Sequence, residues 1–162
     1  MKHAYINGII LDGSKEMEPQ QDKVILTDGE NIEAIVEKAQ IEDKDLTEYE
    51  ITDLAGNYIM PGLINLHLHL PATGKPKKKQ QDPVKLVKLL TSNALLRKLA
   101  LNLCASSAKT QLLSGVTTIR TVGGVLDFDS KIRDQIKAGK LIGPRILSCD
   151  MAVSVERWKS VV

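Results

Sequence analysis

PGLINLHLHL, residues 61–70, is the stretch where the pattern of the chain changes, and two of its three histidines lie there. The Pro61-Gly62 pair is followed by a compact hydrophobic run, which is typical of a strand buried on both faces, as in a parallel sheet. Residues i and i+2 of a strand point to the same face, so we expect His67 and His69 to project together. Two neutral imidazoles on one strand make half of a first-row metal site, suited to Zn²⁺.

A simpler interpretation of the histidine pair is also open. In it, both rings are ordinary strand side chains held by hydrogen bonds, and a two-residue motif is common enough by chance to allow this. Placement favours the metal site, because His67 and His69 fall at the carboxyl end of the first strand of a βα series, where barrels and open sheets carry their chemistry. The third histidine, His3, belongs to the first N-terminal strand and is not an expected ligand.

Helical and strand patterns alternate after residue 70. Apolar residues recur at helical spacing over residues 83–114, after Asp82 as the expected N-cap. Such a helix is unusually long, so we expect a break near Thr91 or Ser106. Its leucines are expected to face the core, namely Leu86, Leu89, Leu90, Leu96, Leu99 and Leu103. The later elements are a strand at 116–122 closed by Gly123-Gly124, a helix at 127–142 and a strand at 144–155. A βαβαβ series makes a right-handed parallel sheet or barrel segment.

The first sixty residues have the pattern of short strands separated by turns. Asn7-Gly8 and Asp28-Gly29 are dipeptides that favour tight hairpin turns between β-forming residues. Residues 42–50 are acidic and polar, typical of a solvated loop, and residues 50–60 return to strand character. This segment is therefore predicted to be a small all-β layer.

Composition and charge exclude several classes of protein. With 162 residues, 43% hydrophobic and 26% charged, the chain is typical of a globular protein of roughly one domain. A net charge of +2 gives no reason to expect a nucleic-acid partner. Cys104 and Cys149 form neither a disulfide framework nor a metal clip, so we expect buried thiols in a reducing compartment. Without a signal-peptide core or a run of about 18 apolar residues, we expect a cytoplasmic protein with no membrane partner.

Several ordered motifs are similar to those of one family. PGLINLHLHL looks like the PGLIDxHxH signature that opens the barrel of the amidohydrolase superfamily. SGVTTIRTVGG at 114–124 and GPRILSCDMAVS at 143–154 resemble the GxTTVRDxGG and GPRxLxSGxAxS segments of its imidazolonepropionase-like and prolidase-like branch. The N-terminal pieces INGIILDG, VILTDGENIEAI and TDLAGNYIMPG are similar to motifs of the small β-sandwich before that barrel. The resemblance covers about residues 5–155.

The resemblance implies a metal-dependent hydrolase with a (β/α)₈ barrel, in which one or two Zn²⁺ ions activate water to attack an amide or other C–N bond. His67 and His69 would hold the more buried ion. In the family the other ligands come from later strands: a Lys or acidic residue on the fourth, a His on the fifth and sixth, and an Asp on the eighth. A full barrel takes about 250 residues, whereas only about 100 follow position 60.

Local departures from the family indicate an incomplete enzyme. Asn65 and Thr121 stand where the family usually has Asp, and a catalytic zinc site normally takes three protein ligands where this chain supplies two. The final residues, VERWKSVV at 155–162, replace the Gly-rich turn with which the family continues. Our hypothesis is that a frameshift or premature stop truncated a longer hydrolase at this point.

The sequence therefore predicts an α/β protein: a β-sandwich domain at 1–60, the first strands and helices of a truncated (β/α)₈ barrel at 61–155, and a divergent tail at 156–162. Its predicted function is that of the N-terminal part of a metal-dependent amidohydrolase, with metal ligands His67 and His69, no assigned catalytic residue and no activity alone. The alternative is a non-catalytic remnant or interaction module. The full-length family takes small-molecule or dipeptide substrates, and the exposed barrel edge predicts self-association.

Overall fold

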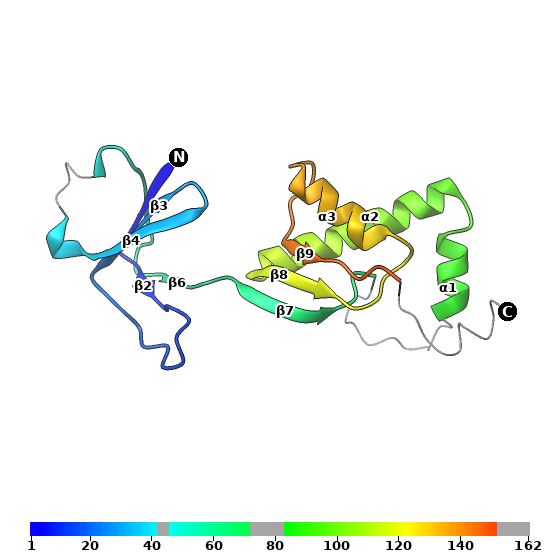
Figure 1. Ribbon diagram of the computed structural model, residues 1–162, viewed down its shortest axis with the longest axis horizontal. Coiled ribbons are helices and arrows are strands. Elements are labelled where there is room, and N and C mark those ends of the chain that lie inside the picture. The colour runs from blue at the N-terminus through cyan, green and yellow to red at the C-terminus, as the bar shows by residue number, and fades with distance from the viewer. Residues whose placement is uncertain (42–45, 72–82, 152–162) are drawn as a thin grey trace. The chain divides into compact units, whose positions relative to one another are not determined.

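The computed structural model describes residues 1–41, 46–71 and 83–151 (Figure 1). The chain divides into two compact units, Met1–Pro61 and Gly62–Val162. The described part of the first consists mainly of strands, and in the second strands and helices alternate, so the predicted α/β class is confirmed. Within the described ranges, no helix is both long and apolar enough to cross a membrane.

The described residues of the N-terminal unit form two sheets. Strand order is β4-β3-β1-β5 in the larger sheet, and β2 pairs with β6 in the smaller one. Its elements are β1 (Lys2–Ile6), β2 (Ile9–Ile10), β3 (Lys23–Asp28), β4 (Asn31–Glu37), η1 (Lys38–Gln40), β5 (Glu50–Asp53) and β6 (Tyr58–Ile59). Alternate residues of β1 and β3 face a small core in which Ala4, Val24 and Leu46 are buried. The unit therefore depends on few apolar contacts.

One of the two predicted hairpins is present. β3 and β4 form an antiparallel pair across the Asp28-Gly29 turn, as the dipeptide predicts. The hairpin predicted at Asn7-Gly8 is wrong, because β1 pairs with β3 and β5 whereas β2 pairs with β6. A Cβ on Gly8 would lie 2.3 Å from Leu54 Cδ1. Close packing, not a hairpin turn, therefore requires this glycine.

The second unit is a three-stranded parallel sheet in the order β7-β8-β9, with helices in its connections. Its elements are β7 (Leu63–Leu68), α1 (Pro83–Leu90), α2 (Ala94–Leu113), β8 (Val116–Thr121), α3 (Phe128–Lys137) and β9 (Arg145–Leu147). α2 packs against β8 and α3, and α3 packs against β9, as Figure 1 shows. The predicted alternation of strands and helices is thus present, and it places the carboxyl ends of the three strands at one edge.

The predicted break in the long helical segment is present near Thr91. α1 ends at Leu90, and Asn93 begins α2 as its N-cap, with its side-chain oxygen accepting a hydrogen bond from Leu96 N at 2.9 Å. The other candidate break, Ser106, lies inside an uninterrupted helix. The predicted N-cap Asp82 lies outside the described residues.

The buried side of α2 differs from the predicted one. Small residues spaced four apart face the core, namely Ala100, Cys104 and Ala108. They let the helix approach Ile119 of β8 and Ile132 of α3, which are fully buried. The prediction that the leucines of this segment face the core is wrong in part, since Leu89, Leu99 and Leu103 are each more than half exposed. The cysteines also divide: Cys104 is buried as predicted, but Cys149 is exposed.

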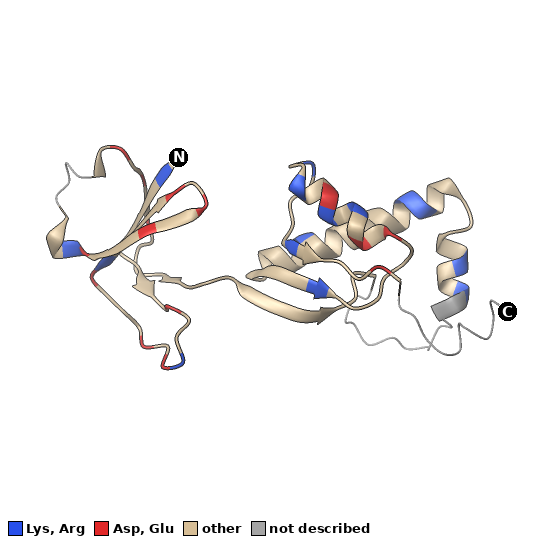
Figure 2. Cartoon of the chain, viewed as in Figure 1, with Lys and Arg blue, Asp and Glu red and all other residues tan. Residues whose placement is uncertain are grey.

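The expectation that β7 is buried on both faces is wrong in this structure. Leu63, Ile64 and Leu66 are at least half exposed, because among the described residues β7 pairs only with β8. Leu70 just beyond the strand is fully buried, and Leu68 packs against the same core. Charged residues of both signs are spread over both units (Figure 2), whereas β7 has none. The strand thus presents an uncharged apolar surface.

Candidate metal centre

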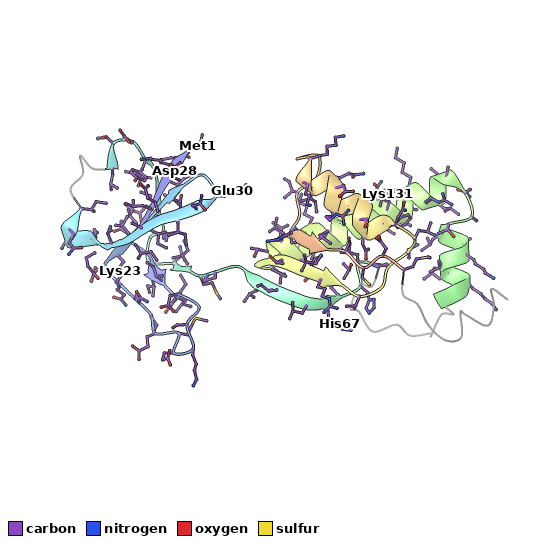
Figure 3. All side chains as sticks on the ribbon, in the orientation of Figure 1. Met1, Lys23, Asp28, Glu30, His67 and Lys131 are labelled. Atoms are coloured by element: carbon purple, nitrogen blue, oxygen red, sulfur yellow. The ribbon has the colours of Figure 1, made fainter. Side chains whose placement is uncertain are left out.

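His67 and His69 lie at the carboxyl end of β7, and both residues are exposed. Figure 3 labels His67 at this end of the strand. Their ring centroids are 5.3 Å apart, with an interplanar angle of 74°. The rings are thus brought together at the edge of the parallel sheet, neither diverging nor sealed among aliphatic side chains. Two imidazoles this close together could both reach one ion.

β7 has a bulge at His67. Asn65 pairs with Ile119 and Leu68 with Thr121, so three steps on β7 match two on β8. The extra residue breaks the strict alternation of faces and redirects side chains, as bulges commonly do. Asn65 Oδ1 accepts a hydrogen bond from His67 N at 3.1 Å. A prediction from strand alternation alone misses this feature.

The His69 ring is held by the turn after β8. Its Nδ1 lies 2.8 Å from the carbonyl oxygen of Gly123. Because a carbonyl oxygen only accepts hydrogen bonds, Nδ1 of the neutral ring carries the hydrogen and Nε2 carries the free lone pair. Ligating histidines are commonly fixed in this way by a second hydrogen bond. Nε2 is therefore the atom of His69 available to a metal ion.

A buried carboxylate lies behind the same turn. Asp129, at the start of α3, has a side chain that is 0% exposed, and neither oxygen has a hydrogen-bond partner among the described residues. Burial raises its pKa above the ordinary value of 3.8, and the charge of Asp150 adds to the rise. The neighbouring Thr121 hydroxyl and His69 lower the pKa of Asp129, although Thr121 does not reach hydrogen-bond geometry. The sequence pattern indicates Asp127 or Asp129 only as an acidic residue near the start of a helix, which is ordinary, and does not reveal the burial of Asp129.

Asp150 connects the end of β9 with α3 and with the turn. Its carboxylate accepts hydrogen bonds from Ser130 N at 2.9 Å and from Ser130 Oγ at 2.6 Å. Its carbonyl oxygen accepts a hydrogen bond from Gly124 N. Arg133 donates to Ser148 Oγ at 2.7 Å in the same cluster. These contacts fix the edge of the sheet that carries the histidines.

The donor set fits half of a zinc site. Within 1–41, 46–71 and 83–151, no group of three or more His, Cys, Asp or Glu residues is arranged to hold a metal ion. Catalytic zinc sites normally use three protein ligands and a water molecule. The histidine pair can supply two of these ligands, so the described residues form a partial centre.

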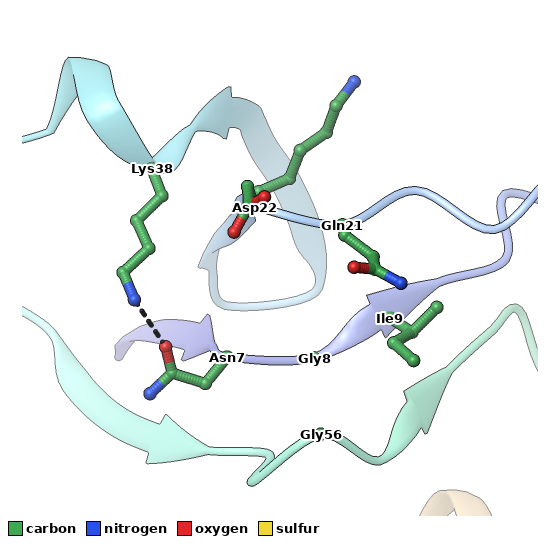
Figure 4. Close-up of a pocket in the computed structure, with 8 residues that line it drawn as sticks. Asn7, Gly8, Ile9, Gln21, Asp22, Lys38 and Gly56 are labelled. Atoms are coloured by element: carbon green, nitrogen blue, oxygen red, sulfur yellow. Dashed lines mark hydrogen bonds between the residues drawn. The ribbon is translucent and has the colours of Figure 1, made fainter.

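A pocket lies in the N-terminal unit, and neither histidine lines it. Asn7, Gly8, Asp22 and Lys38 are among the residues that line it (Figure 4). Lys38 Nζ donates a hydrogen bond to Asn7 Oδ1 at 2.7 Å, so its ammonium group serves the fold there. Lys23, which also lines the pocket, pairs with Glu37 at 3.4 Å, so both lysines have partners within the fold and we assign no chemistry to this pocket.

Solved structures provide the comparison. No protein-family model and no curated protein matches the sequence. A putative prolidase from Bifidobacterium longum is 29% identical, with a TM-score of 0.68, covering 93% of this chain and 30% of that one. A Xaa-Pro dipeptidase with bound methionine is 25% identical, with a TM-score of 0.71, covering 95% and 34%. The predicted relation to the amidohydrolase superfamily is confirmed.

Another amidohydrolase, 25% identical and with a TM-score of 0.71, covers 95% of this chain and 32% of its own length. The chain thus spans about a third of the amidohydrolase structures it matches. Coverage of 95% of the chain means that the match extends over both units. Molinate hydrolase and phenylurea hydrolase B, at 22% and 19% identity, share the fold.

Proposed function

We propose that this chain is the N-terminal part of a metal-dependent amidohydrolase that cleaves amide or other C–N bonds. In this proposal residues 1–60 form the small β-sandwich domain that precedes the barrel, and residues 61–155 open a (β/α)₈ barrel. The parallel order β7-β8-β9 and the nearly complete coverage by prolidase-like structures support it. The proposed tail at 156–162 lies outside the described residues, and a cytoplasmic location stays a prediction from the sequence.

The observation that carries the proposal is the histidine pair. His67 and His69 would hold a zinc ion, with the His67 backbone fixed by Asn65 and the His69 ring fixed by Gly123. A zinc ion bound there would lower the pKa of a water ligand to about 7 and polarise the carbonyl of the substrate. Because the described residues supply two ligands, this chain is expected to bind zinc weakly and not to turn substrate over.

For the whole enzyme we propose dipeptides and other small amides as substrates. One similar structure is a Xaa-Pro dipeptidase with methionine in its active site, and another is a prolidase complexed with N-methylphosphonate-L-proline. In this fold the loops that would select among such substrates follow later strands of the barrel. We therefore propose the class of bond that is cleaved and no individual substrate.

Zinc titration of the purified chain tests the proposal. Calorimetry should show one weakly bound ion, lost in His67→Ala and in His69→Ala. His3→Ala is the matched control, because His3 pairs with Glu50 in the N-terminal unit at 3.7 Å. A dipeptide ending in proline should not be hydrolysed. Absence of zinc binding, or binding that survives both substitutions together, would contradict the metal-centre assignment.

A second candidate function is that of a non-catalytic interaction module, favoured by the exposed apolar face of β7. Unpaired strand edges and uncovered apolar faces favour association. We propose that this face pairs with a second copy of the chain, and the variants that test this are given in the Discussion.

A further inference from the structure

The Gly123-Gly124 turn meets the His69 ring at Gly123 and the Asp129 carboxylate at Gly124. Gly123 O accepts the hydrogen bond from His69 Nδ1. A Cβ placed on Gly124 would lie 2.7 Å from both oxygens of Asp129, closer than real Cβ contacts come. No left-handed φ is involved at Gly124, so lack of space alone excludes a side chain there.

Asp129 cannot easily move away from the turn. It is the second residue of α3, between Phe128 and Ile132, which are both buried in the core. The start of α3 is itself held by Asp150 through the hydrogen bond from Ser130 N. A carboxylate packed in this way cannot make room for an added Cβ, because protein interiors are close-packed and side chains there have few alternative positions.

We propose that the Gly123-Gly124 turn, packed against the Asp129 carboxylate, fixes the His69 ring with Nδ1 as the donor and Nε2 as the metal-binding atom. Gly124 and Asp129 are then positioning residues, which act on the ligand through the carbonyl of Gly123. The inference rests on the proposed function of His69 as a metal ligand, and it adds the residues that select which nitrogen binds.

The choice of nitrogen has a direct physical cause. If the turn moved and the carbonyl of Gly123 were lost as an acceptor, nothing described at Nδ1 would hold the hydrogen there. The neutral ring would then divide between its two tautomers and rotate more freely. Outer hydrogen bonds of this kind commonly change metal affinity by about 10- to 100-fold.

The tautomer can be measured without any metal. The full chain, labelled with ¹⁵N-histidine, is examined by long-range ¹H–¹⁵N NMR at a pH of about 8, above the ordinary histidine pKa. His3→Ala and His67→Ala spectra assign the signals. We expect His69 to show a protonated Nδ1 and an unprotonated Nε2. A protonated Nε2 in the unsubstituted chain would overturn the inference.

Paired substitutions test the role of the turn. Gly124→Ala should abolish the Nδ1–H preference and lower zinc affinity about tenfold or more. Gly124→Ala combined with Asp129→Ala removes the atoms that the new Cβ would meet, and should restore both. Asp127→Ala is the matched control, since this neighbouring carboxylate pairs at the surface with Lys131 at 3.0 Å and should change neither.

The outcomes separate this inference from the proposed function. Gly124→Ala with an unchanged tautomer, or a double variant that fails to recover it, would overturn the inference. If Gly124→Ala does not fold, a folded double variant with the Nδ1–H tautomer supports the steric argument, and an unfolded one contradicts it. An unsubstituted chain with the expected tautomer but no zinc binding would instead contradict the metal centre and leave the role of the turn supported.

Discussion

Asn65 Oδ1 accepts a hydrogen bond from the backbone N–H of His67 at 3.1 Å, across the bulge of β7. This contact gives a structural role to a residue that departs from the family pattern, in which Asp is usual. Both amide and carboxylate oxygens can accept this bond. The local geometry of the strand therefore survives the replacement of a carboxylate by an amide, although the charge beside the histidines is lost.

Substitution of Asn65 tests this role. Asn65→Asp should keep the hydrogen bond and strengthen zinc binding, because a negative charge is added beside the ligands. Asn65→Ala should weaken zinc binding about tenfold, through loss of the acceptor that orients His67. Calorimetry measures both, with Asn57→Ala as control, since Asn57 bonds to Leu54 O in the N-terminal unit. Equal affinity in all variants would show that Asn65 does not orient the pair.

The buried Asp129 should produce a pH dependence of stability. Burial raises its pKa in the folded chain above 3.8, so folding favours the protonated form. Compared with Asn at the same position, Asp129 therefore stabilises the folded chain most below the pKa of the unfolded state. This stabilisation is lost as pH rises through the pKa of the folded state. The free energy of unfolding of the unsubstituted chain minus that of Asp129→Asn should therefore fall as pH rises from about 4 to 7.

Urea unfolding at several pH values measures this difference. Asp134→Asn is the control, because the hydrogen bond from Arg133 lowers the pKa of Asp134 and its contribution should have the opposite sign. A difference for Asp129→Asn that stays constant with pH would mean that burial does not shift this carboxyl group.

The buried face of α2, which carries small residues, should not tolerate a larger side chain. Ala108 is fully buried, and its Cβ lies 3.8 Å from the position of a Cβ on Gly143. Ala108→Leu should lower the free energy of unfolding by about 1–3 kcal/mol through overpacking. Leu103→Ala, at a side chain that is 58% exposed, should change it by about 0.5 kcal/mol or less. Urea unfolding compares the two, and the reverse order would contradict the observed facing of the helix.

The apolar surface of β7 should drive association. Ile64 is 64% exposed on this strand, and Ile64→Lys should shift the chain toward a monomer by adding a charge to the exposed surface. Ile32→Lys is a matched control, because Ile32 is 66% exposed in the N-terminal unit. Sedimentation at several concentrations gives the mass. A monomer in the unsubstituted chain would remove the support for pairing between copies.

Much of the second unit was predictable because the residues that begin and end its helices and strands can be recognised from local sequence. Gly115 and Pro83 mark element ends, and the β-branched run at 116–121 and the helical spacing before it have clear periods. The break near Thr91 followed from length alone. The histidine pair was visible for the same reason, since two residues one apart on a strand need no tertiary information to be brought close.

What sequence reasoning missed depends on tertiary packing. Hydrophobicity favoured the leucines of α2 as its core face, but the close approach to β8 and α3 selects Ala100, Cys104 and Ala108. The Asn7-Gly8 hairpin failed because distant strands compete for the same edges. Asp129 gains significance only through its burial against Gly124, which no local pattern reveals.

Asp150 holds α3 with its side chain and Gly124 with its main chain. A helix, a turn and the end of β9 are therefore joined at one residue. In the turn, Gly124 is next to Gly123, whose carbonyl oxygen accepts the hydrogen bond from His69 Nδ1. A shift of Asp150 would therefore move the Gly123 carbonyl oxygen and, with it, the hydrogen-bond acceptor that holds the imidazole of His69.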